Sequence, residues 1–89
     1  MPYIKKDKRL RYDIQLEILA DLINEVPEEE KAGVVNYVVT RIIHRVFQPP
    51  KYNTYNSAMG VLECIKQELY RRIIANYEDI KKNENGDVN

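Results

Sequence analysis

The sequence predicts an all-α fold of two or three helices, of which the last is the longest. Apolar residues recur at three- and four-residue steps through three stretches of the chain, which is the spacing of one helix face. Prolines separate these stretches, and no run alternates strictly between apolar and polar residues as a half-exposed strand would. The 89 residues suffice for one small domain with a thin core, which we expect oligomerisation to complete.

The first helix is expected over residues 13–25. Asp13 is a candidate N-cap, because a short acidic side chain at that place accepts a hydrogen bond from the first turn. No Lys or Arg occurs between residues 12 and 30, so this helix is acidic. Its apolar positions are Ile14, Ile18, Leu19, Leu22, Ile23 and Val26.

The second helix is expected from Pro27 to about Phe47. Proline suits the first position of a helix, and Glu28, Glu29 and Glu30 follow in the first turn, where the helix dipole favours negative charge. The β-branched run at residues 34–43 also allows a strand, but no second strand exists to pair with it. We therefore expect a helix with a broad apolar face.

The third helix is expected after the loop that Pro49 and Pro50 create, with Asn53 or Thr54 as its cap and an end near Lys81. At 1.5 Å per residue it would be roughly 40 Å long, against roughly 30 Å for the second helix. We expect the helices to pack as a hairpin, with the remaining apolar length covered by the first helix or by another subunit. The expected stripe consists of Ala58, Leu62, Ile65, Leu69, Ile73 and Ile80.

The chain is expected to comprise a basic arm at 1–12, a helical domain at 13–82 and a polar tail at 83–89, in which Gly86 can stop the helix. Residues 1–11 hold five bases and one acid, a net charge of +4, whereas residues 12–30 hold seven acids, a net charge of −7. The arm could bind a nucleic acid, but the acidic segment competes with phosphate for it. Because the whole chain is neutral, nucleic acid is not the expected partner.

Cysteine and histidine usage argues against several kinds of chemistry. Cys64 and His44 are single, so the sequence offers no internal disulfide and no zinc ligand set, and Cys64 in an apolar stretch is expected to be a small core residue. No cofactor-binding or catalytic motif occurs, which predicts a protein that is not an enzyme. No apolar run reaches the roughly 18 residues of a membrane span, and the charged start lacks the apolar core of a secretory signal. A cytoplasmic location is expected.

Two helical faces carry candidate ligand-binding residues. The expected second helix has two polar rows, Asn36-Thr40-His44 and Gly33-Tyr37-Arg41. The third helix carries Tyr70-Arg71-Arg72, where two guanidinium groups that suit phosphate stand beside a ring that can stack on a base. The alternative is that both faces are solvated, with local ion pairs from Glu63 to Lys66 and from Glu68 to Arg72. Gly60, inside the helix, indicates close approach of another backbone or a ligand, of which packing is the simpler reason.

Several strings carry a family resemblance: MPYIKK, NYVVTRIIH, YNSAMGVLECIKQELYRR, YED and NGDV. The chain resembles a family of small uncharacterised proteins of bacteriophage and mobile-element genomes. The resemblance implies a phage-related, non-enzymatic protein in the host cytoplasm. Where such proteins often read A-P-Y-E-D, this chain has Asn76 in place of proline, which leaves the helix free to continue.

Two functional hypotheses follow. Some small helical phage proteins that oligomerise sequester nucleotide-derived immune signals, so by analogy the chain is a sponge for a cyclic nucleotide or an ADP-ribose-type ligand, serving immune evasion. The ligand-binding residues would be Tyr37, Arg41, His44, Tyr70, Arg71 and Arg72 in a homo-oligomer. The alternative is a protein–protein adaptor or structural accessory that docks through the apolar stripe of the third helix.

Overall fold

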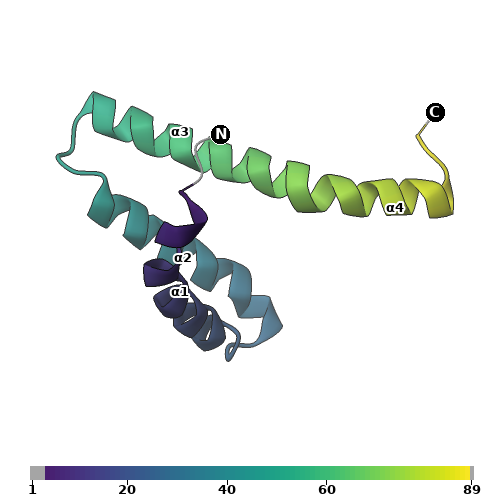
Figure 1. Ribbon diagram of the computed structural model, residues 1–89, viewed down its shortest axis with the longest axis horizontal. Coiled ribbons are helices and arrows are strands. Elements are labelled where there is room, and N and C mark those ends of the chain that lie inside the picture. The colour runs from purple at the N-terminus through teal and green to yellow at the C-terminus, as the bar shows by residue number, and fades with distance from the viewer. Residues whose placement is uncertain (1–3, 89) are drawn as a thin grey trace. The chain divides into compact units, whose positions relative to one another are not determined.

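The computed structural model describes residues 4–88, and every regular element in this range is helical (Figure 1). The first three residues of the predicted arm and the last residue of the predicted tail lie outside the described residues. The elements are the 3₁₀ turn η1 (Lys6–Lys8), α1 (Leu10–Ile23), α2 (Glu28–Val46), α3 (Tyr52–Leu69), the π-helical turn η2 (Tyr70–Ile74) and α4 (Ala75–Asn85). The last three are continuous and form one helix of 34 residues, so the predicted all-α class with a long C-terminal helix is confirmed.

The chain divides into two compact units, Met1–Ile42 and Ile43–Asn89. In the first unit, α1 and α2 are joined by a short link in which the Glu30 amide donates to the Pro27 carbonyl at 2.9 Å. The half-buried apolar side chains of this unit lie in the link and on both sides of it: Leu19, Ala20, Ile23, Val26, Val34 and Val38. The rest of each apolar face in this unit is exposed.

The predicted start of the first helix is wrong by three residues. The N-cap of α1 is Arg9, whose helical backbone follows directly on η1 and whose side chain makes no capping bond. The Arg9 carbonyl accepts from the amides of Tyr12 and Asp13 at 2.9 and 3.0 Å, while the Arg9 Nε donates to the Ile4 carbonyl at 2.9 Å. Asp13 is therefore a first-turn residue, and the helix extends into the segment predicted as an arm.

Helix α2 begins and ends within one residue of its predicted bounds, so the strand alternative for its β-branched run is wrong. The charge pattern at its start explains the N-terminal bound, because three glutamates follow Pro27 in the first turn. Its last turn belongs to the second unit.

The second unit holds the loop after α2 and the long helix. The N-cap of the long helix is Lys51, which has an extended backbone and makes no side-chain capping bond. The predicted caps at Asn53 and Thr54 are therefore wrong, and both residues lie in the first turn of α3. The first backbone bond runs from the Tyr55 amide to the Lys51 carbonyl at 3.0 Å. Ala58 is the only fully buried residue within 4–88, with 6% of its surface exposed.

The long helix continues four residues beyond its predicted end. In η2 the Ala75 amide bonds the Tyr70 carbonyl, five residues back, instead of the four of an α-helix. The helix then runs through Asn76, as the absence of a proline there predicts. It stops at Gly86, whose φ of 88° is in the left-handed region that favours glycine and whose amide donates to the Lys82 carbonyl at 2.8 Å.

Candidate functional site

The polar row of α2 contains one paired site. Arg41 Nη1 donates to the Tyr37 hydroxyl at 3.0 Å, and the Arg41 guanidinium carbon lies 5.8 Å from the centre of the Tyr37 ring. Both side chains are exposed, so the pair offers a positive charge beside an aromatic face. His44, one turn further along, is also exposed, and its backbone carbonyl accepts from Gln48 Nε2 at 2.7 Å.

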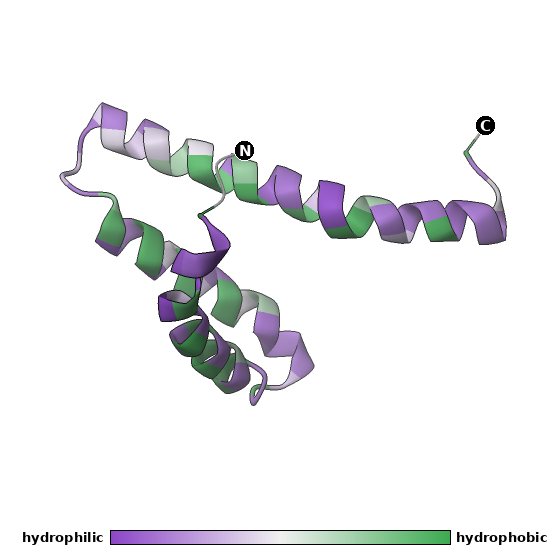
Figure 2. Cartoon of the chain, viewed as in Figure 1, coloured by the Kyte–Doolittle hydropathy of each residue, from purple (hydrophilic) through white to green (hydrophobic). Residues whose placement is uncertain are grey.

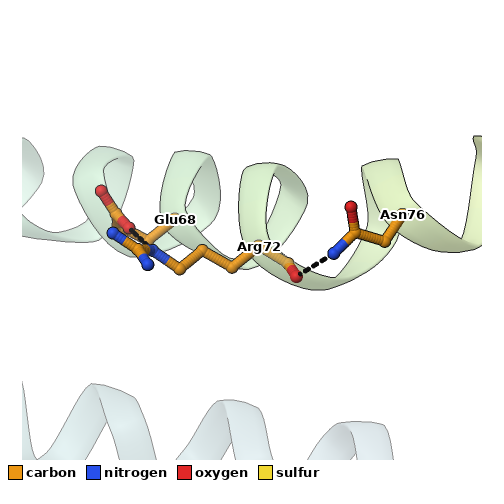
Figure 3. Close-up of polar contacts among 3 residues, drawn as sticks. All are labelled: Glu68, Arg72 and Asn76. Carbon is orange, nitrogen blue, oxygen red and sulfur yellow. Dashed lines mark hydrogen bonds and ion pairs between the residues drawn. The ribbon is translucent and has the colours of Figure 1, made fainter.

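The second group of predicted ligand residues, Tyr70-Arg71-Arg72, lies in η2. Figure 3 shows Arg72 between two neighbours: its Nε donates to Glu68 Oε2 at 3.0 Å, and its carbonyl accepts from Asn76 Nδ2 at 2.9 Å. The Glu68 carboxylate therefore offsets the charge of Arg72. Asn76 thereby satisfies a backbone carbonyl of the π turn.

Tyr70 is held by an acid two turns further along. Its hydroxyl hydrogen-bonds to the Glu78 carboxylate, and this bond, with the negative charges of Glu78 and then Asp79, raises the pKa of Tyr70 above its usual value of 10. The phenol therefore stays protonated at neutral pH and already has a partner. The side chain of Arg71 has no hydrogen bond or ion pair with any residue within 4–88, which distinguishes it from Arg72.

The local ion pairs expected under the solvated-face alternative are present. Lys66 Nζ lies 3.7 Å from Glu63 Oε1, and Arg72 pairs with Glu68 as described. Each such pair contributes about 0.2–0.5 kcal/mol to an isolated helix. These pairs account for the charges of Lys66 and Arg72 without a ligand, but not for that of Arg71.

A shallow concavity of about 390 Å³ lies at the end of α4, beside the tail that follows Gly86. It is lined by Tyr70, Ala75, Glu78, Asp79, Lys81, Lys82, Asn85, Gly86, Asp87 and Val88. Three carboxylates against two ammonium groups make it a poor receptor for an anion. The sequence analysis did not predict this concavity, although it did predict that the helix can stop at Gly86, beside which the concavity lies.

The second unit carries an apolar seam along the long helix, which Figure 2 colours green in patches from α3 into α4. The seam consists of Tyr55, Ala58, Leu62, Ile65, Leu69, Ile73, Tyr77 and Ile80. Sequence reasoning had found six of these residues and missed the two tyrosines. Leu69, Ile73 and Tyr77 are 50%, 61% and 59% exposed, so the seam is open over η2 and α4.

Two predictions about small residues need correction. Cys64 is exposed and not a core thiol, because it lies away from the seam. At Gly60 no atom beyond its two chain neighbours and the nearby backbone of its own helix lies within 4 Å of the place a Cβ would take, so no close approach among the described residues accounts for the glycine.

These features define a small helical protein whose helices leave many of their large apolar side chains exposed. The chain belongs to the family described as Domain of unknown function (DUF6899), whose sequence profile matches residues 1–88. The expectation of an uncharacterised family is thereby confirmed. No curated protein and no solved structure matches the chain.

Two further findings apply to residues 4–88. No helix there combines the length and the apolar composition that a bilayer span requires. The same residues contain no group of three or more His, Cys, Asp or Glu side chains placed to hold a metal ion.

Proposed function

We propose that this chain is a non-enzymatic interaction protein, an adaptor or structural accessory that acts by burying its apolar helix faces against other protein chains. The observation that carries the proposal is the exposure of those faces. Within residues 4–88 only Ala58 is fully buried, while α1, α2 and the long helix all leave large apolar side chains about half exposed or more. Exposed apolar side chains that gather on one helix face are typical of protein-binding sites.

We further propose, from the resemblance of the sequence to phage and mobile-element proteins, that the protein acts in the host cytoplasm. The assignment as a protein that is not an enzyme rests on the sequence, in which Cys64 and His44 are single and no catalytic motif surrounds them.

The second candidate is the sponge for a cyclic nucleotide or an ADP-ribose-type signal. It is favoured by the exposed pair of Tyr37 and Arg41, which combines a guanidinium with a stacking surface. It is weakened by the partners of Arg72 and Tyr70 and by the acidic concavity beside Tyr70. The adaptor is therefore the better supported of the two.

Native mass spectrometry of the purified full chain separates the two candidates. The adaptor predicts assemblies of protein chains without a bound small molecule. A co-purifying nucleotide would instead support the sponge, and a bare 10.5 kDa chain at every concentration would contradict both.

Calorimetric titration with a panel of cyclic di- and trinucleotides and ADP-ribose tests the sponge directly. If a member binds, Arg41→Ala should weaken it by about ten- to a hundredfold, because a charge-assisted hydrogen bond contributes roughly 1.5–3 kcal/mol. Arg72→Ala is the matched control, since Glu68 already offsets its charge. Absence of binding across the panel would remove the sponge hypothesis.

A further inference from the structure

Helix α1 is apolar on two opposite sides. One side holds the half-buried side chains of Leu19, Ala20 and Ile23. The other side holds an outer row at steps of four residues, each of which turns the helix by only about 40° beyond a full turn. This outer row consists of Leu10, Ile14, Ile18 and Leu22, whose exposed fractions are 67%, 58%, 64% and 60%. A helix with apolar residues on both sides is typical of one that packs on both sides.

The charges along α1 run largely against its dipole, which favours acids at the N-terminus and bases at the C-terminus. The basic end comprises Lys5, Lys6, Lys8, Arg9 and Arg11, whereas residues 12–30 hold seven acids and no base. Within residues 4–88 none of these five bases forms an ion pair, and neither do the acids Asp13, Glu17 and Asp21 of the same helix. The described part of the chain therefore leaves both ends of α1 without a partner of opposite charge.

We propose that α1 pairs antiparallel with α1 of a second copy of the chain, with the two outer rows in contact. The proposal rests on the proposed function as an interaction protein and names the surface and the partner. An antiparallel pair places each basic end beside the acidic end of the other copy, whereas a parallel pair would place like charges together. If the pair is centred on residue 16, Leu10 lies level with Leu22 of the second copy, and Arg11 lies level with its Asp21, because the members of each pair are equally far from that centre.

Charge complementarity favours a second copy over other occupants of this surface. A polyanion would be attracted by the basic end of α1 but repelled by Asp21 and by the acids that follow it. A two-fold contact between copies satisfies both ends at once, because each copy contributes the same surface. Four apolar side chains from each copy bury less than the about 1,200 Å² at which stable interfaces begin, so we expect a weak contact that depends on the charged ends.

Charge exchange in the full chain tests the pairing. Arg11→Glu alone and Asp21→Lys alone should each weaken association by about tenfold, because each places like charges together across the contact. The double variant should recover association, since its negative residue 11 meets the positive residue 21 of the second copy. Within one chain these positions are about 15 Å apart along the helix, so an ion pair inside the chain does not explain a recovery. No recovery, or single variants that associate like the wild type, would overturn the proposal.

The charge substitutions separate association from folding. Both place their new charge where the helix dipole favours it, so a loss of association does not come from a weakened α1. Ile18→Gln tests the outer row and should weaken association, whereas Val88→Gln, at a tail residue that is 97% exposed, should leave it unchanged. Sedimentation velocity measures association, which added salt should weaken in the wild type. Equal association of Ile18→Gln and Val88→Gln, or a wild type insensitive to salt, would overturn the proposal.

Orientation is tested with Leu10→Cys and Leu22→Cys, each in a Cys64→Ser background because Cys64 is exposed. On oxidation a mixture of the two variants should form links between unlike chains. Either variant alone should link far less, because like positions are about 18 Å apart along an antiparallel pair. Preferential links between like chains would overturn the proposal and leave the proposed function standing. A wild-type monomer that binds a different protein would do the same, and a monomer with no protein partner would contradict both.

Discussion

Replacing Gly60 by alanine should stabilise the protein. Gly60 lies inside α3, and apart from its chain neighbours and the nearby backbone of that helix no atom is within 4 Å of the place that a Cβ would take. A glycine inside a helix costs about 0.8–1.0 kcal/mol relative to alanine, chiefly because the unfolded chain loses more freedom. Gly60→Ala should therefore raise the free energy of unfolding by about that amount, or the Tm by roughly 4–8 °C.

The assay is urea unfolding followed by circular dichroism at one fixed chain concentration, because association makes stability concentration-dependent. Gly33→Ala in α2 is the matched control, since its Cβ position is also open. A loss of stability in Gly60→Ala but not in Gly33→Ala would mean that a partner's atoms occupy the space beside Gly60. That result would refute the reasoning that the space beside Gly60 is open.

Three further outcomes are expected. Gly86→Ala should lower the free energy of unfolding by about 1–2 kcal/mol in the same urea assay, because φ is 88° there, whereas no loss would mean that the helix stop can form without glycine. Asn76→Ala should lower the free energy of unfolding by about 0.5–1.5 kcal/mol, because it removes the side-chain hydrogen bond to a carbonyl of η2. Asn83 makes no such bond, so Asn83→Ala should lower the free energy of unfolding by less. Because Glu78 raises the pKa of Tyr70, this contact contributes stability below pH 10 that is lost as the pH rises through the raised pKa. Glu78→Gln should bring that pKa back towards 10 in an NMR titration of the Tyr70 ring, and an unchanged value would exclude Glu78 as the cause.

The number and order of the helices could be predicted because the spacing of apolar residues indicates a helix within each segment, and the prolines mark where one segment ends and the next begins. The boundaries were less accurate because no side-chain cap forms at Asp13 or Asn53: α1 grows directly out of η1, and α3 starts from the extended Lys51. The π turn could not be recognised from the stripe alone, since a step of four residues from Leu69 to Ile73 is also normal for an α-helix.

The local pairs of the candidate site were predictable, and the wider contacts were not. Residues four apart on a helix are neighbours, so the pairing of Tyr37 with Arg41 and of Glu68 with Arg72 follows from spacing. Tyr70 and Glu78 are eight residues apart, and η2 lies between their positions, so the three- and four-residue spacing of a regular helix did not indicate their contact.

The central claim is that the apolar helix faces are covered by other protein chains, in the first instance by copies of this one. Sedimentation equilibrium of the wild-type chain over the micromolar range tests it most directly. The account predicts a mass above 10.5 kDa that falls towards that value on dilution, with the helical circular dichroism signal falling as the chains separate. A mass of 10.5 kDa at every concentration, with an undiminished helical signal, would contradict it.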